Sequence, residues 1–80
     1  MNKLFEEVKD IIRKYAFDKA LVDKAQENSK IIADLRINSA RIVDIVLDIE
    51  EKYDIDIDDK SLERIISIKD AMNIISEKLK

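Results

Sequence analysis

Residues 34–57 read DLRINSARIVDIVLDIEEKYDIDI, and this stretch decides the fold because it contains one clearly amphipathic helix. The apolar residues that recur in it at helical spacing are Ile42, Ile45, Val46, Ile49 and Tyr53. Such a stripe is typical of a helix that packs one face on a core. Asn38 can accept a hydrogen bond from an unpaired amide of the first turn, so we expect the helix to run from about residue 39 to residue 53.

The same stretch concentrates negative charge. Residues 34–59 contain nine acidic and three basic side chains, whereas the segments on either side are slightly basic. Asp44, Asp48 and Glu51 recur at spacings of four and three, which predicts one exposed acidic strip along the helix. Repulsion from phosphate disfavours nucleic acid as a partner, and the strip favours a basic protein partner instead.

The composition excludes several classes of protein. Eighty residues suffice for a single domain, 1–80, with one core. Glycine and proline are absent, and 46% apolar with 41% charged residues is typical of a small helical bundle. Histidine and cysteine are absent too, which removes the usual nucleophile pairs, thiolate metal sites and disulfides and disfavours a hydrolase. No run of the sequence approaches the roughly 18 apolar residues of a membrane span. Acidic residues near the start stand where a signal peptide would have its apolar core. We therefore expect a cytoplasmic protein.

The segment before this stretch predicts one helix and a long connection. Apolar residues at spacings of three and four predict a first helix over about residues 3–15, with Asn2 as its N-cap. Residues 16–38 are less regular and can contain a short helix. We expect Ile31, Ile32 and Leu35 to hold this connection across the bundle, because a long loop in a small domain needs such anchors.

An acidic segment, residues 54–59, follows the central helix. Its alternating Asp and Ile could suggest a strand, but four acids in six residues favour an extended loop. The same spacing invites comparison with a calcium-binding EF-hand loop. Asp59 stands where that loop needs Gly and Ile65 where it needs Glu, so we expect no dedicated metal site.

The remaining residues predict two more helices. Asp58 or Asp59 can cap a short helix over residues 60–65, with Leu62, Ile65 and Ile66 turned inward. The pair Ser67 and Asp70 resembles a capping box at the start of a last helix. The apolar stripe of that helix consists of Ile68, Ala71, Met72, Ile75 and Leu79.

These residues together resemble the acyl carrier protein family. That family has Asp-Ser-Leu at the start of a helix that ends in Leu-Glu-Glu-x-Phe, then an acidic loop with Ile and a short third helix. Here Asn38-Ser39-Ala40 is followed by Ile49-Glu50-Glu51-Lys52-Tyr53 and by Asp56-Ile57-Asp58-Asp59. The correspondence needs no gap over residues 34–75, about half of the chain. The resemblance implies an all-α four-helix bundle with a short third helix and a long loop between helices one and two.

The resemblance also implies a non-catalytic carrier. Ser39 would bear a 4′-phosphopantetheine arm that a phosphopantetheinyl transferase takes from coenzyme A. The arm would carry acyl groups as thioesters to acyl-transferring, ligating or condensing enzymes of fatty acid, lipid or polyketide-type biosynthesis. Those partners would carry basic docking patches, and the carrier itself is expected to be a monomer.

Two sets of residues take family roles by resemblance. The expected partner-docking residues are Ala40, Arg41, Val43, Asp44, Leu47, Asp48, Glu51, Asp59 and Glu63. The residues expected to line an acyl-chain shelter between the helices are Val46, Ile49, Ile57, Ile65 and Ala71.

The sequence departs from the family pattern beside the attachment serine. Asn38 replaces the usual Asp, Ala40 replaces a large apolar residue, and Arg41 replaces a common acid. These changes indicate a specialised carrier with partners of its own. Arg36 and Asp58 stand where Gly and Pro are frequent, and we expect them to change only loop geometry.

Two other functions stay open. One is an unmodified acidic helical module that binds a basic partner without a covalent cofactor. The other is a peptidyl or aminoacyl carrier, which ranks lower because its central helix is usually less acidic.

Overall fold

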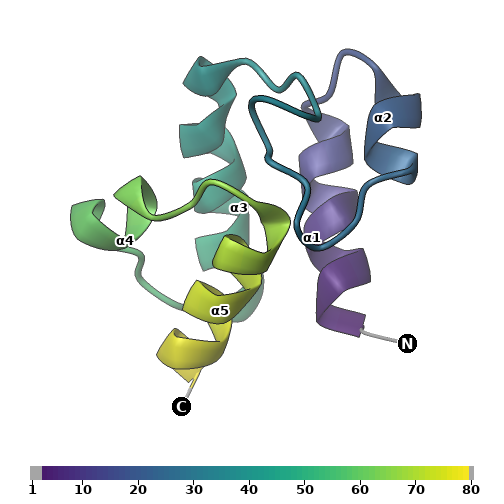
Figure 1. The fold of residues 1–80 in the computed structure, drawn as a ribbon. Helices are drawn as coiled ribbons and strands as arrows, with labels where there is room; N and C mark the ends of the chain where they lie inside the picture. The colour runs from purple at the N-terminus through teal and green to yellow at the C-terminus, as the bar shows by residue number, and fades with distance from the viewer. Residues whose placement is uncertain (1–2, 80) are drawn as a thin grey trace.

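The structure is a computed structural model that describes residues 3–79 (Figure 1). All regular elements of this part of the chain are helices, and it contains no strand. Its elements are α1 (Lys3–Lys14), α2 (Lys19–Asp23), the 3₁₀ helix η1 (Ser39–Arg41), α3 (Ile42–Tyr53), α4 (Asp59–Glu63) and α5 (Ile68–Leu79). The predicted fold is confirmed: α1, α3 and α5 are long, α4 is the short third helix of the bundle, and α2 lies within the long first connection.

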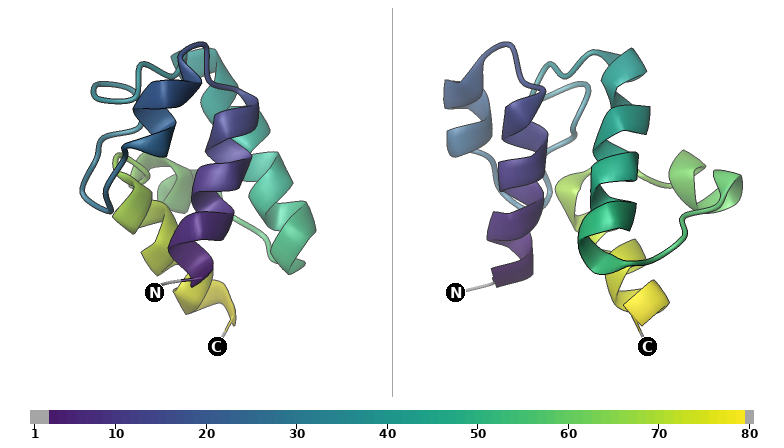
Figure 2. Two further views of the ribbon diagram at one scale, coloured as in Figure 1. Left: turned by 90° about the vertical axis from the view of Figure 1, so that its right-hand side faces the viewer. Right: turned by 180° about the vertical axis from the view of Figure 1, so that it is seen from behind.

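The long helices bury one common core. Helix α1 packs against α5, α2 and α3, and α3 also contacts α5. The largest side chains that are fully buried are Ile12, Ile31, Ile37, Ile45, Ile49, Ile68, Ile75, Val8 and Val22. Helix α1 and helix α3 run in opposite directions, so the end of α1 and the start of α3 meet at one end of the molecule (Figures 1 and 2). The start of α1 and the end of α5 lie at the opposite end of the molecule.

Local hydrogen bonds set the helix boundaries, largely as predicted. The Asn38 side chain accepts from the Ala40 amide at 2.9 Å and caps η1, so the predicted helix over 39–53 begins with a tighter 3₁₀ turn. Asp58 accepts from the Ser61 amide at 2.8 Å and caps α4. Asp54 ends α3 in the left-handed region at φ 54°, a conformation that Asp tolerates better than most residues other than Gly. The predicted cap at Asn2 lies outside the described residues.

The predicted capping box at the start of α5 is confirmed. The Ser67 amide donates to the Asp70 carboxylate at 2.9 Å, and the Asp70 amide donates to the Ser67 hydroxyl at 3.2 Å. The amide of Ile66 also donates to Asp70, at 3.1 Å. The backbone amide of Ser67, with further help from that of Ile66, holds the pKa of Asp70 below its ordinary value.

Replacing Asp70 by alanine should therefore destabilise the fold near neutral pH but much less in acid. A carboxylate whose pKa is lowered by folding stabilises fully above its unfolded pKa of about 3.9, and this contribution is lost as the pH falls through the lower folded pKa. We expect Asp70→Ala to cost about 0.5–2 kcal/mol in urea denaturation near neutral pH. Asp56→Ala is the control, since Asp56 is exposed and makes no hydrogen bond within residues 3–79. A cost of Asp70→Ala that stays unchanged as the pH is lowered through the acid range would contradict this role.

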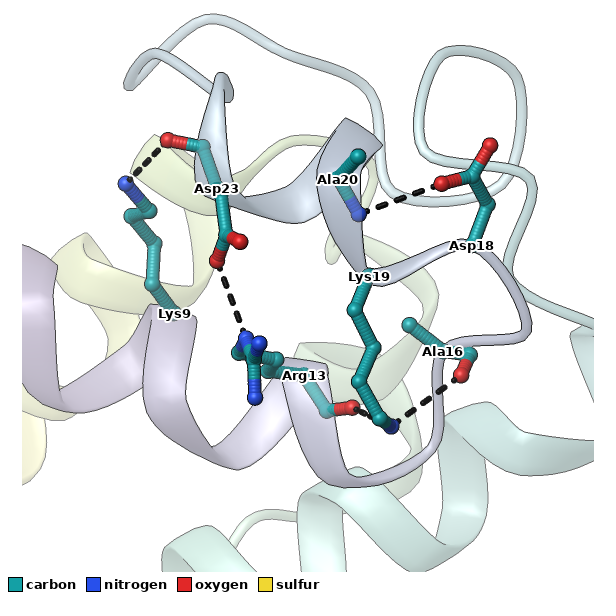
Figure 3. A network of polar contacts seen from close by, with 7 residues as sticks. All are labelled: Lys9, Arg13, Ala16, Asp18, Lys19, Ala20 and Asp23. Atoms are coloured by element: carbon teal, nitrogen blue, oxygen red, sulfur yellow. Dashed lines mark hydrogen bonds and ion pairs between the residues drawn. The ribbon is translucent and has the colours of Figure 1, made fainter.

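Helix α2 is fastened to α1 by polar contacts (Figure 3). Arg13 forms an ion pair with Asp23 at 2.9 Å, and Lys9 donates to the Asp23 carbonyl at 3.2 Å. Lys19 donates to the carbonyl of Arg13 at 2.9 Å. These contacts, with the burial of Val22, place the short helix beside α1.

The rest of the long connection is hydrogen bonded to the start of α5. The Ile31 amide donates to the Ile66 carbonyl at 2.8 Å, and the Ile68 amide donates to the Ser29 carbonyl at 3.1 Å. Lys30 and Ser67 form an isolated antiparallel bridge between them. This pairing leaves only the short span that follows, residues 32–38, to lead into η1.

Three predicted inward positions are wrong. Ile32, Ile66 and Leu79 are at least half exposed. The turn over residues 30–35 points Ile31 and Leu35 into the core, so Ile32 between them faces outward. Ile66 uses its backbone to join the connection to α5, and its side chain points away. Leu79 lies in the last turn of α5, where Ile74 and Ile75 already fill the inner face.

Candidate attachment site and docking surface

Ser39 is the first residue of η1 and has an exposed side chain. Its carbonyl accepts from the Ile42 amide, which continues the turn into α3. Asn38 satisfies the Ala40 amide, so the Ser39 hydroxyl is not used as a cap. The hydroxyl makes no hydrogen bond with any residue in 3–79. It is therefore free to react at the start of a helix, where the amides create a positive end.

Most other hydroxyl groups of the chain are engaged. Tyr15 and Tyr53 donate to the carboxylates of Asp48 and Glu7, at 2.6 and 2.5 Å. The remaining serines are Ser29, whose hydroxyl accepts from Gln26, Ser67 in the capping box, the buried Ser61, and Ser76. Ser76, on α5, is exposed without a hydrogen bond inside the described range, so it is the natural comparison for Ser39.

The predicted acidic strip of α3 divides into two environments. Asp44 pairs with Arg41 at 3.0 Å on the exposed surface, and Glu51 is exposed. Asp48 instead turns toward α1, where it accepts from Tyr15 at 2.6 Å and pairs with Lys14 at 2.9 Å. Only 23% of the Asp48 side chain is exposed, so its predicted place on a free strip is wrong. Periodicity could not show this, because both partners belong to α1.

These contacts also change the titration of the three groups. The hydrogen bond from Tyr15, followed by that from Lys14, holds the pKa of Asp48 below its ordinary value. The same bonds to Asp48 raise the pKa values of Tyr15 and Lys14 above their ordinary values. Asp48 thus remains charged while it ties α1 to α3.

An apolar surface adjoins Ser39 along α3. Val43 and Leu47 are 53% and 55% exposed and lie four residues apart, on one side of the helix. Ala40, one turn before Val43, is exposed as well. The predicted acids of α4, Asp59 and Glu63, are also exposed. The structure thus leaves most of the predicted docking residues accessible.

The residues predicted to shelter an acyl chain belong to the core. Val46, Ile49, Ile65 and Ala71 are buried in one cluster, and Ile57 packs against it from the acidic loop. They come from α3, the loops that flank α4, and α5. Their side chains contact a common core, so a chain entering here would have to spread α3 and α5 apart.

Curated proteins from several bacteria match this chain over nearly its whole length. It is 38% identical over 72 residues to an acyl carrier protein of Campylobacter fetus subsp. fetus, which covers 90% of this chain and 91% of that protein. It is 37% identical over 80 residues to an acyl carrier protein of Thermotoga maritima, which covers 98% of this chain and 94% of that protein. The chain belongs to the acyl carrier protein family. No family model matches it.

The resemblance that rested on residues 34–75 is thus confirmed for the family. An acyl carrier protein of Picosynechococcus is likewise 37% identical over 79 residues, 96% of this chain and 93% of that protein. Within residues 3–79, no helix is long and apolar enough to cross a membrane. The same residues contain no group of three or more acids that could hold a metal ion. The roles of individual site residues stay predictions.

One feature of the candidate site, a groove, was not predicted from the sequence. A groove of about 480 Å³ lies beside Ser39, between the end of α1 and the segment that leads into η1. The residues that line it are Lys14, Tyr15, Ala16, Phe17, Arg36, Asn38 and Arg41. Three of them are cations and none is an acid. No sequence pattern could reveal the groove, because its two walls are far apart in the chain.

Proposed function

We propose that this protein carries acyl groups as thioesters on a 4′-phosphopantetheine arm attached to Ser39. The free and exposed Ser39 hydroxyl at the start of η1 is the observation that carries the proposal. A separate transferase would supply the arm from coenzyme A. The Ser39 oxygen forms a bond to phosphorus, the pyrophosphate P–O bond of coenzyme A breaks, and adenosine 3′,5′-bisphosphate leaves. The arm also supplies the thiol that a chain without cysteine lacks.

The site fits a phosphodiester for electrostatic reasons. Ser39 precedes the twelve residues of α3, so a phosphate on it would lie near the positive end of the helix dipole. That placement stabilises an anion by about 0.3–1 kcal/mol at an exposed position. The interaction helps to orient the root of the arm and leaves its far end mobile.

The surface around Ser39 suits brief contacts with enzymes. Exposed Ala40, Val43 and Leu47 offer apolar contact, and exposed Glu51, Asp59 and Glu63 offer negative charge to basic patches. Complementary charge speeds encounter, while a small contact area allows rapid release. Both properties suit a carrier that visits a transferase and then several acyl-transferring, ligating or condensing enzymes of fatty acid, lipid or polyketide-type biosynthesis.

The proposed docking surface depends less on the charges of Asp44, Asp48 and Arg41. The Arg41–Asp44 ion pair neutralises charge next to the arm, and Asp48 is held by α1. We therefore assign the main electrostatic contact to Glu51 and the α4 acids. We still predict that the protein is located in the cytoplasm and that it is a monomer.

The core between α3 and α5 is the proposed shelter for an acyl chain. Val46, Ile49, Ile65 and Ala71 present only apolar surface there, with Ile57 at the edge. A fatty chain gains about 0.8 kcal/mol for each methylene that it buries. Such a gain would offset part of the cost of moving the helices apart.

Incubation with coenzyme A and a promiscuous phosphopantetheinyl transferase tests the proposal. We expect the intact mass of the folded protein to increase by one phosphopantetheine group. Circular dichroism on the same sample confirms that the helices are present. A folded protein whose mass does not change would refute the carrier and leave an unmodified module that binds basic partners.

A further inference from the structure

We propose that the groove beside Ser39 binds the phosphodiester of the arm, chiefly through Arg36, and so directs the root of the arm over the end of α1. This inference rests on the proposed attachment at Ser39. It assigns a ligand-binding role to Arg36, Phe17 and Lys14, which lie outside the docking surface described above.

The lining of the groove selects an anion. Lys14 comes from the end of α1, Arg36 from the long connection and Arg41 from η1, so three separate segments each contribute a cation. The absence of acids from the lining distinguishes this place from the rest of an acidic protein. The groove of about 480 Å³ is within the usual range of sites that hold small ligands.

Arg36 is the cation with the most unused binding capacity. Lys14 is paired with Asp48 and Arg41 with Asp44, so nearby carboxylates already offset both charges. Arg36 makes no hydrogen bond or ion pair with any other described residue. Its planar guanidinium can give two parallel hydrogen bonds to a phosphate, a geometry that lysine cannot match.

The backbone holds Arg36 at this position. Its φ of 57° lies in the left-handed region, which costs a residue other than glycine roughly 1–2 kcal/mol. Leu35 and Ile37 on either side are both 2% exposed, so their burial in the core keeps the strained residue in place. Arg36 is therefore presented by its neighbours and not by contacts of its own side chain.

Ser39 directly follows a residue of the groove lining in the chain, so a phosphate on it would lie next to the groove. Asn38, the residue before Ser39, is part of the lining, and its side chain is held by the hydrogen bond that it accepts from the Ala40 amide. A covalently attached phosphate has an effective concentration in the millimolar range or above for a neighbouring site. Weak charge-assisted hydrogen bonds are then sufficient to keep it bound.

The aromatic residues of the lining match the next unit of the arm. In 4′-phosphopantetheine the phosphate ester oxygen is followed by a methylene group and then by a carbon that bears two methyl groups. Phe17 is fully exposed, and Tyr15 lies two residues before it in the same lining. Contact of those methyl groups with the Phe17 ring would remove apolar surface from water.

Nuclear magnetic resonance of the unloaded and loaded protein tests this proposal, with loading verified by mass. We expect loading to shift the Arg36 side-chain Nε–H signal and the amides of residues 15–17. We also expect nuclear Overhauser effects between the two methyl groups of the arm and the Phe17 ring. Arg36→Gln should remove most of the amide shifts of residues 15–17 and most of the Overhauser effects to Phe17, whereas Lys60→Gln, which replaces a cation of α4 outside the lining, should retain them.

Two outcomes would count against different claims. A protein that loads fully but leaves the Arg36 and Phe17 signals unchanged would overturn the groove as a binding site and retain the proposed function. Full retention of the amide shifts and of the Overhauser effects in Arg36→Gln would overturn the role of Arg36. Failure to load would instead refute the attachment at Ser39.

Discussion

Ser39→Ala is expected to take up no phosphopantetheine, while Ser76→Ala should load at the rate of the unaltered protein. Both serines are exposed and lack hydrogen bonds within residues 3–79. Only Ser39 stands at the start of a helix beside an apolar and acidic surface. Alanine at position 39 removes the attacking oxygen, so the loss should be complete and not merely a slower reaction.

Both variants replace an exposed serine by alanine. A difference between them therefore reports the position of the serine in the fold and not the loss of a hydroxyl group in general. Loading is measured as the fraction of mass-shifted protein over time, with coenzyme A and transferase in excess. Asn38, which makes the cap, stays intact in both variants, so both should remain folded. A mass increase that survives Ser39→Ala would reject this attachment site, and peptide mapping would then locate the true one.

Ile75→Ala in α5 should be strongly destabilising. Ile75 is fully buried between the long helices. Truncating a buried isoleucine to alanine costs about 2–5 kcal/mol, because the lost contacts leave a cavity. A domain of this length has a total stability of roughly 4–12 kcal/mol, so a large fraction of it would be lost. Urea denaturation followed by circular dichroism measures the change.

Leu79→Ala is the matched control on the same helix. Leu79 is 55% exposed in the last turn, so its truncation should change the free energy of unfolding by about 0.5 kcal/mol or less. Equal effects of the two substitutions would mean that α5 presents a different face to the core.

The predictable parts of the fold are those set by neighbours in sequence. Asn38 was expected to cap the central helix and Ser67 with Asp70 to begin the last, and each uses hydrogen bonds that span only a few residues. Likewise, the stripe that contains Ile45 and Ile49 is buried as its spacing indicates. Such features need no knowledge of how the helices pack.

Apart from Leu79 in the last turn of α5, the errors and omissions involve contacts between distant segments. Ile32 and Ile66 are apolar, yet the pairing of the long connection with the start of α5 turns them outward. Asp48 has the spacing of an exposed acid, but Tyr15 and Lys14 draw it to α1. Ser39 could be proposed as the attachment residue from the sequence because the motif around it is contiguous. The basic groove beside it could not, because it exists only after α1 packs against α3.

The opposed directions of α1 and α3 have a practical consequence. Helix α1 begins at Lys3 and α5 ends at Leu79, both at the end of the molecule away from Ser39 (Figures 1 and 2). A linker, fluorescent label or solid support joined at either of these ends would therefore not obstruct the serine. The protein should therefore tolerate immobilisation, or fusion of several copies in tandem, while Ser39 stays accessible to enzymes in solution.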